Sequence, residues 1–218
     1  MTADRDHPHA EALAHLRAAD ERMAALIARA GPCRLQRRAS GVLRQHETFA
    51  ALVEAIVSQQ LSSKAAETIF GRVRALMDNT LAPEGLLALE EERLRGAGLS
   101  GAKTRSVRDL AEHVRRGDLA LDALPVMADE DVIAALTRVR GIGRWTAEMV
   151  LIFQLGRPDV LPVGDLGVQK GLQKLFGLRQ LPAPERMVKL AKPFRPYRSV
   201  ASWYLWRIND EKTAPAAR

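Results

Sequence analysis

The chain has 218 residues, of which 47 % are hydrophobic and 27 % are charged, a composition typical of a folded globular protein. No apolar run approaches the roughly 18 residues of a membrane span, and the N-terminus lacks the basic and then apolar stretch of a signal peptide. The 33 Lys and Arg outnumber the 26 Asp and Glu, and the formal net charge of +7 favours an anionic partner such as nucleic acid, although many basic proteins bind none.

Apolar residues recur at the helical period along most of the chain. Residues 11–32 carry one apolar face and stop at a Gly-Pro pair, so we expect a single helix there. The apolar stripe returns over residues 49–60 and is followed by a helix that either Ser62 or Ser63 can cap. Further helical patterns cover residues 82–98, 103–117, 128–139, 165–177, 183–194 and 198–208.

No segment shows the sustained period-two alternation of a half-buried strand, so we predict an all-α fold. Residues 96–101, GAGLSG, match the dinucleotide-binding pattern G-x-G-x-x-G literally. That pattern must follow a strand, and here a helical pattern precedes it, so we interpret it as a helix end and turn. The lone cysteine, Cys33, excludes an internal disulfide and any iron–sulfur site that needs several cysteines.

Residues 136–156, LTRVRGIGRWTAEMVLIFQLG, place a tight turn between two amphipathic runs. We expect the first helix to end near Val139 and the second to begin near Arg144. Gly141 and Gly143 permit unusual backbone angles and a close approach of another backbone. The unpaired N–H groups at the start of the second helix suit an anion such as a phosphate, whereas the alternative is a plain helix turn. The residues that the second helix should bury are Ala147, Val150, Leu151 and Phe153.

This hairpin is one of five segments that, in this order, resemble the helix–hairpin–helix DNA glycosylase superfamily. The other four are AIVSQQLSSKAA, GLSGAKTRSVRDLA, DVLPVGDLGVQKGL and RPYRSVASWYLWR. The resemblance covers roughly residues 12–210 and is greatest to the 3-methyladenine DNA glycosylase II family, in a compact form without the extra N-terminal domain of its larger members. It implies a single domain over residues 1–218, with an active-site cleft between two helical lobes. The lobes would comprise residues 47–158 and residues 11–46 plus 159–210.

The resemblance implies a monofunctional DNA glycosylase of base excision repair. Such an enzyme flips alkylated bases of the 3-methyladenine and 7-methylguanine type out of double-stranded DNA and hydrolyses their bond to the sugar. Asp165 lies at the position of the family's catalytic aspartate. A carboxylate there can stabilise positive charge on the deoxyribose and orient the attacking water. The alternative role of Asp165 is to cap the following helix, and the two roles are compatible.

Three further residues match the base pocket of the family. Trp145 stands where members that cleave the DNA strand have a nucleophilic lysine, so no Schiff base is expected here. Trp145 and Trp206 match aromatic positions whose faces can hold a cationic alkylated purine by stacking and cation–π attraction, although tryptophans also fill cores. Met149, one helical turn after Trp145, replaces an aromatic residue of the family and puts the selectivity of the pocket in question.

The expected DNA contacts come from two segments. Gln60, four residues after Ile56 in the apolar stripe, matches the side chain that enters the duplex and fills the gap left by the flipped nucleotide. The alternative is a glutamine at a helix end. The other expected contacts are Arg140, Gly141, Gly143, Arg144 and Thr146. The backbone carbonyls of Thr137, Val139 and Ile142 match positions that hold a monovalent cation, Na⁺ or K⁺, in the superfamily.

No further cofactor is required, and the single cysteine excludes the four-Cys iron–sulfur cluster of related branches. We expect a cytoplasmic, DNA-associated monomer without a membrane partner. Three other functions stay open: a strand-cleaving glycosylase for oxidised bases, a helix–hairpin–helix DNA-binding module without activity, and a helical scaffold. Asp165 and the two tryptophans argue against the module, because binding phosphate needs none of them.

Overall fold

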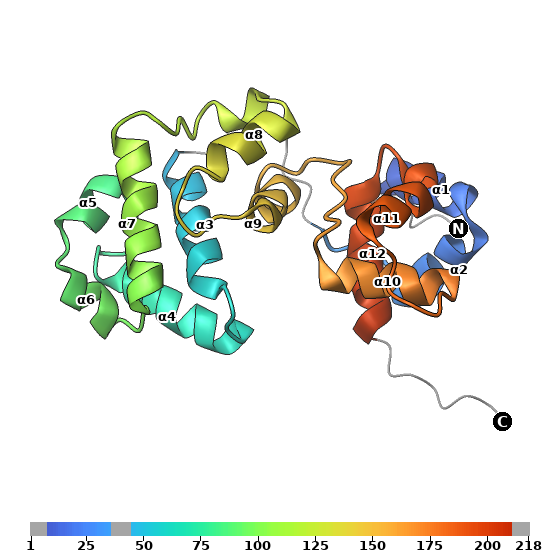
Figure 1. Ribbon diagram of the computed structural model, residues 1–218, viewed down its shortest axis with the longest axis horizontal. Coiled ribbons are helices and arrows are strands. Elements are labelled where there is room, and N and C mark those ends of the chain that lie inside the picture. Colours follow the sequence, from blue (N-terminus) through green and yellow to red (C-terminus); the bar gives the residue numbers. More distant parts are fainter. Residues whose placement is uncertain (1–7, 36–44, 211–218) are drawn as a thin grey trace. The chain divides into compact units, whose positions relative to one another are not determined.

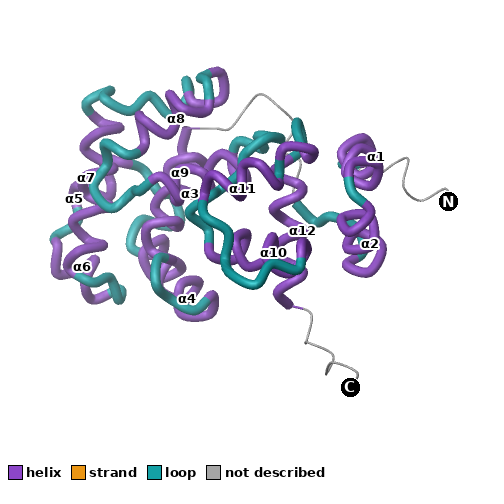
Figure 2. Tube along the Cα trace, turned by 45° about the vertical axis from the view of Figure 1, so that its right-hand side comes forward, coloured by secondary structure: helices purple, strands orange, loops and turns teal. Residues whose placement is uncertain are grey.

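The computed structural model describes residues 8–35 and 45–210 of the chain. Within these two ranges every regular element is a helix (Figure 1, Figure 2), which confirms the all-α prediction. The chain divides into two compact units, one formed by residues 1–38 with 156–218 and the other by residues 39–155.

The predicted lobe boundaries, after residues 46 and 158, lie near the two divisions of the structure. The first division falls within residues 36–44, which lie outside the described part of the chain. No helix among the described residues is long and apolar enough to cross a membrane.

The described part of the first unit is built around its last helix. Its elements are α1 (Ala10–Ala19), α2 (Glu21–Ala30), α10 (Leu166–Phe176), α11 (Pro184–Leu190), the short η3 (Lys192–Phe194) and α12 (Arg198–Asp210). Helix α12 contacts α1, α2 and α10. The hydroxyl of Tyr204 on α12, which is fully buried, donates a hydrogen bond of 3.0 Å to the carbonyl of Gly31 just after α2. The two ends of the chain therefore share one core.

The prediction of one continuous helix over residues 11–32 was wrong. The chain breaks at Asp20, whose backbone is extended (φ −160°, ψ 126°) and whose side chain accepts from the N–H groups of Arg22 and Met23. Aspartate competes in this way with the helical backbone and favours a cap. The hydrogen-bonded Arg22 guanidinium also lowers the pKa of the Asp20 carboxyl below its usual range. The apolar residues on both sides of the break stay buried.

The second unit packs around α3 and α7. Its described elements are α3 (Gln45–Ser58), α4 (Ser63–Ala75), α5 (Pro83–Ala88), α6 (Glu91–Gly96), α7 (Gly101–Arg115), η1 (Leu124–Val126), α8 (Asp129–Leu136), α9 (Arg144–Met149) and the π-helical turn η2 (Val150–Gln154). Helix α7 contacts α3, α5 and α6, and α3 also contacts α4 and η2. Fully buried residues of α3 in this core include Phe49, Leu52 and Ile56.

Local chemistry decides where these helices begin and end. Ser62 caps α4 through its side chain, which resolves the choice between Ser62 and Ser63. Residues 82–98 form two short helices, α5 and α6, where we predicted one. The glycine-rich stretch over residues 96–101 is the end of α6 and the start of α7, which Ser100 caps, so the interpretation as a helix end and turn is confirmed.

The hairpin differs from its prediction at the end of its first helix and in the burial of Phe153. Helix α8 ends at Leu136, three residues before Val139, and the hydroxyl of Thr137 donates back to the Ile133 carbonyl at 2.8 Å. Helix α9 begins at Arg144, as predicted. The expectation that Phe153 is buried was wrong, because this side chain is 40 % exposed. The wider π-helical turn from Val150 to Gln154 changes the angular spacing of its side chains, so the α-helical period no longer predicts which face is buried.

Candidate active site

Asp165 is held at the N-terminus of α10 by two donors. Its Oδ1 atom accepts a hydrogen bond from the backbone N–H of Val168 and another from the indole Nε1–H of Trp206, each 2.8 Å long. The residue is the N-cap of α10 and is buried. The capping role of Asp165 is therefore confirmed. The two bonds orient the carboxylate, which is what a catalytic role requires, and that role stays a prediction.

Gly167 allows Trp206 to reach Asp165. A Cβ atom at position 167 would lie 2.7 Å from Cδ1 of Trp206 and 3.0 Å from Oδ1 of Asp165. A Cβ atom at Gly171, one helical turn further along α10, would overlap the backbone carbonyl of Leu205 on α12. These two glycines bring α10 and α12 together, and our sequence analysis missed both. The available signal was their spacing of four residues, which places them on one face of the predicted helix.

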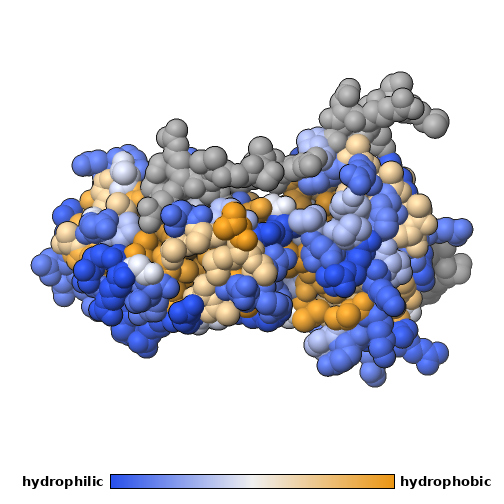
Figure 3. Space-filling view, turned by 90° about the horizontal axis from the view of Figure 1, so that it is seen from above, coloured by the Kyte–Doolittle hydropathy of each residue, from blue (hydrophilic) through white to orange (hydrophobic). Residues whose placement is uncertain are grey.

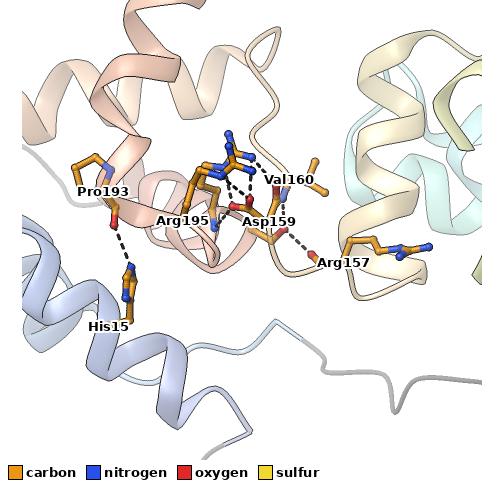
Figure 4. A network of polar contacts seen from close by, with 8 residues as sticks. His15, Arg157, Asp159, Val160, Pro193 and Arg195 are labelled. Carbon is orange, nitrogen blue, oxygen red and sulfur yellow. Dashed lines mark hydrogen bonds and ion pairs between the residues drawn. The ribbon is translucent and has the colours of Figure 1, made fainter. Parts of the chain in front are cut away.

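The segment that leads to Asp165 is tied to the start of α12 by an ionic cluster (Figure 4). The carboxylate of Asp159 accepts from Nε of Arg198 at 2.7 Å and from Nε of Arg195 at 3.1 Å. In the same view, the ring of His15 on α1 lies 3.0 Å from the carbonyl of Pro193. Charged groups from two parts of the sequence, residue 159 and residues 195–198, thus meet at this segment.

Ser199 on α12 makes a second tie to the same segment. Its buried hydroxyl donates to the carbonyl of Arg157 at 2.6 Å and accepts the N–H of Val160 at 3.0 Å. Further along, the N–H of Asp165 bonds the carbonyl of Pro162 at 3.0 Å. These bonds fix the path of residues 157–165, and so they help to position the carboxylate at its end.

Trp145 lies on the first turn of α9 in the second unit and is 46 % exposed. The tryptophan is therefore not a core residue of its own unit. Hydrophilic and hydrophobic side chains both reach the face of the molecule shown in Figure 3. The predicted base pocket would combine Trp145 and Met149 with Trp206 and Asp165 of the first unit, and this combination stays a prediction.

The two hairpin glycines serve different purposes. Gly141 has a positive φ of 80°, and a Cβ atom there would lie only 2.5 Å from Oγ of Ser106 on α7. Gly143 has no atom within 4 Å of such a Cβ. Gly141 is therefore needed for packing inside the unit, whereas Gly143 keeps an open backbone surface. Of the two glycines, Gly143 is the better candidate for a close phosphate.

The polar residues of the hairpin are already engaged inside the unit. The N–H of Arg140 donates to Oδ2 of Asp109 on α7 at 2.7 Å, while the Arg140 residue itself is exposed. The guanidinium of Arg144 pairs with Glu130 at 2.6 Å and with the buried Glu148 at 3.2 Å. Arg144 thereby lowers the pKa of Glu130, and its own pKa is raised by the same contact. Thr146 is buried, so the structure does not expose this predicted DNA contact.

Gln60 lies just beyond α3. The expectation that it continues the apolar stripe of that helix was wrong, because α3 ends at Ser58. Gln60 sits in the turn that follows, with a positive φ of 58°, and it is exposed. Its neighbour Gln59 reaches the hairpin through its side-chain amide, which donates to the carbonyl of Gly141 at 2.8 Å. The sequence analysis assigned no role to Gln59.

Met149 lines a groove within the second unit. The groove has a volume of about 260 Å³ and lies between α3 and the end of the hairpin. Glu54 and Ser58 come from α3, and Phe153 and Gln154 come from η2. The methionine gives the groove a flexible, apolar wall, which can adapt to neighbouring groups of different shape.

The ligands predicted for a monovalent cation are three backbone carbonyl oxygens of the hairpin. Thr137 is the C-cap of α8, and Val139 and Ile142 are buried. The carbonyl of Val139 accepts the N–H of Ile142 at 3.1 Å and has a second lone pair. Carbonyl oxygens are suitable ligands for such a cation, so the residues fit the predicted role, which stays a prediction.

The described residues thus form an all-α protein. It contains a Gly-x-Gly hairpin and a carboxylate that caps the start of a helix. The family of HhH-GPD superfamily base excision DNA repair proteins matches residues 53–196. Because this match spans more than half of the chain, the chain belongs to the HhH-GPD superfamily.

Characterised relatives and solved structures resemble most of the chain. DNA-3-methyladenine glycosylase 1 of Schizosaccharomyces pombe is 34 % identical over 198 residues, which cover 89 % of this chain and 85 % of the relative. The S. pombe 3-methyladenine DNA glycosylase in complex with abasic DNA matches with a TM-score of 0.80 and 34 % identity, covering 92 % of this chain and 97 % of that one. DNA-3-methyladenine glycosidase of Bacillus halodurans matches with a TM-score of 0.79 and 38 % identity, covering 94 % and 93 %.

Proposed function

We propose that this protein is a monofunctional DNA glycosylase that excises alkylated bases of the 3-methyladenine and 7-methylguanine type from double-stranded DNA. The observation that carries the proposal is the Asp165 carboxylate, which Trp206 and the start of α10 hold in a defined orientation. The names of the relatives given above support the same substrate class.

The proposed chemistry is hydrolysis of the bond between base and sugar. As this bond breaks, its electron pair leaves with the base, and positive charge develops on the deoxyribose. The carboxylate of Asp165 stabilises that charge and orients a water molecule. The water oxygen bonds to the sugar carbon as one of its two protons passes to the carboxylate and from there to solvent. The products are the free base and an abasic site. An alkylated purine that carries positive charge is already a good leaving group, so no strong general acid is needed.

Trp145 supports the monofunctional assignment. A strand-cleaving glycosylase needs an amine at this position to attack the sugar carbon, and an indole cannot do so. The half-exposed indole of Trp145 instead offers a face to a flipped cationic base. The rival assignment, a glycosylase for oxidised bases that forms a Schiff base, has no nucleophile at this position.

The DNA backbone would be bound at the hairpin. Gly143 and the exposed side chain of Arg140 would lie near a phosphate, and Gln60 would enter the duplex. The carbonyls of Thr137, Val139 and Ile142 would hold Na⁺ or K⁺, whose positive charge would also attract a phosphate. We propose that the protein acts as a monomer on DNA inside the cell and requires no other cofactor.

The decisive experiment replaces Asp165 by Asn. The amide keeps an acceptor for Val168 and Trp206 but loses the negative charge, so excision should fall by about two to three orders of magnitude while DNA binding persists. The assay measures abasic sites in duplexes that each contain one defined lesion. Asp118→Asn, which changes an exposed carboxylate in a turn of the second unit, is the matched control and should leave excision unchanged.

Undiminished release of methylated purines by Asp165→Asn would contradict the assignment. Borohydride added during the reaction should trap no covalent adduct between protein and DNA, and an adduct would instead support the strand-cleaving rival. Wild-type protein that binds the duplexes but releases no base would indicate a DNA-binding module.

A further inference from the structure

The turn that carries Gln60 spans residues 58–61 and begins at the last residue of α3. The carbonyl of Ser58 accepts the N–H of Leu61 at 3.2 Å, which closes the turn. Gln60 has a positive φ of 58°, a left-handed conformation that residues other than glycine adopt at some energetic cost. Such a conformation persists only where the surrounding structure determines it. Contacts made by the neighbouring residues hold Gln60 in this conformation.

Lys103 holds the turn from the side of α7. Its ammonium group donates to the carbonyls of Val57 and Gln59, each at 2.7 Å. The Val57 carbonyl lies in the last turn of α3 and the Gln59 carbonyl just beyond it. At a helix C-terminus the carbonyls lack partners inside the helix and a positive charge is favourable. Partial burial lowers the pKa of Lys103, because the ammonium group has lost part of its water. Two short hydrogen bonds offset that loss.

Gln59 holds the turn from the side of the hairpin. Its side-chain Nε2 donates to the carbonyl of Gly141 at 2.8 Å and lies 3.5 Å from Oγ1 of Thr146. Gly141 in turn lies against Ser106 on α7, the helix that also carries Lys103. The turn, α7 and the hairpin therefore form a closed ring of contacts.

We propose that Lys103 and Gln59 are positioning residues that hold the Gln60 turn rigidly against the hairpin, so that Gln60 can displace a base from intact duplex. This inference rests on the proposed function. Opening a paired duplex requires unstacking and unpairing, which costs a few kcal/mol. If the turn shifts when Gln60 enters the duplex, part of the binding energy goes into moving the turn. A turn that is fixed at both ends leaves that energy available for opening the base pair.

The proposal separates Lys103 from an ordinary phosphate contact. A lysine that binds a phosphate contributes equally whether the lesion is paired or already extrahelical, and its loss reduces the salt dependence of binding. A lysine that supports Gln60 matters only when the pair must be opened. The ratio of excision rates on paired and unpaired lesions therefore distinguishes the two roles.

The experiment replaces Lys103 by Met, which keeps the length of the side chain and removes its donors. Excision of 7-methylguanine is measured in a paired duplex and in the same duplex with the lesion in a short unpaired loop. We expect a rate reduction of about tenfold on the paired lesion and less than about threefold on the looped one. Lys103→Arg, which keeps a charged donor, should restore most of the difference. Lys64→Met, the loss of an exposed positive charge on α4, should not change the ratio.

Two measurements keep the test decisive if Lys103→Met folds poorly. Gln59→Met, which removes the amide donor to Gly141, should reduce the same ratio. In a variant with Gln60→Ala, adding Gln59→Met should change the ratio no further, because the residue that Gln59 supports is gone. An equal reduction on both lesions, or an additive effect on top of Gln60→Ala, would overturn the inference.

The outcome also separates this inference from the proposed function. Wild-type protein that releases no base from either DNA refutes the proposed function, and the inference falls with it. Wild-type protein that excises both lesions, with an unchanged ratio in Lys103→Met and Gln59→Met, refutes the inference alone.

Discussion

Gly167 determines how closely the indole of Trp206 can approach the carboxylate of Asp165. The hydrogen of this glycine occupies the place where any other residue would have a methyl or larger group. Because Trp206 is a proposed wall of the base pocket, the same glycine would set the orientation of a proposed pocket wall and of the proposed catalytic group together.

Gly167→Ala should push the Trp206 indole away from Asp165 and lower excision by about tenfold, since small displacements of reacting groups are costly. The matched control is Gly164→Ala, whose added methyl group meets no atom within 4 Å. The measurement is the excision rate of both variants at a temperature at which both are fully folded. A Gly167→Ala variant with the rate of Gly164→Ala would show that the contact with Trp206 is not needed.

Sequence reasoning selected Asp165, Trp145 and Trp206 because their chemical types match a known motif, and their roles in the reaction stay predictions. It did not find Gly167 or Lys103, because their importance depends on which atom of another helix lies a few ångströms away. For Lys103 such proximity has no local signature, whereas for Gly167 the spacing of four residues from Gly171 was the one available signal. Gln60 was selected partly because it continues an apolar stripe, which was wrong since α3 ends before it. Its match to the family's inserting residue stays a prediction.

The hairpin is an element whose shape depends on α7. Asp109 accepts the N–H of Arg140, and Ser106 lies against Gly141, so one helix supports the turn at two points. Gly143, beyond these contacts, faces open space. The two glycines therefore allow stability and DNA binding to be tested separately.

Gly141→Ala should lower the free energy of unfolding by about 2 kcal/mol, because a positive φ and a contact with Ser106 both oppose the new methyl group. Gly143→Ala should leave unfolding unchanged but weaken binding to undamaged duplex. Urea unfolding and a DNA-binding titration measure the two effects. Loss of stability in Gly143→Ala alone would contradict this division.

Helical periodicity predicted the elements well where one face is uniformly apolar. It failed where a side chain competes with the backbone, as at Asp20, and where the helix changes its winding, as from Val150 to Gln154. Both failures concern hydrogen bonds of the backbone, which the apolar pattern does not report. The open choice between Ser62 and Ser63 had the same cause.

At the scale of the whole molecule, Cys33 reports on the folding of the first unit. The side chain is 4 % exposed, and burial raises the pKa of its thiol from 9.0 to about 11. Below pH 9.0 the thiol is neutral in the folded and unfolded states, and its contribution to stability is complete. Above that value the unfolded chain loses the proton first, so stability falls as the pH rises toward 11.

Cys33→Ala should therefore show a smaller loss of stability than the wild type between pH 9 and pH 11. The measurement is the urea midpoint at several pH values for both proteins. Lysines and tyrosines that titrate in the same range are common to both, so the difference between the two curves isolates the thiol. Parallel curves would show that the thiol titrates normally in the folded chain.

The discontinuity of the first unit bears on how the chain folds as it leaves the ribosome. Helices α1 and α2 are made before α10 and α12, but they bury their apolar residues against them, and Tyr204 bonds to Gly31, 173 positions away in the sequence. Residues 39–155 are contiguous and can complete their own core during synthesis. The apolar residues of α1 and α2 that pack against α12 therefore stay exposed until α12 has been synthesised.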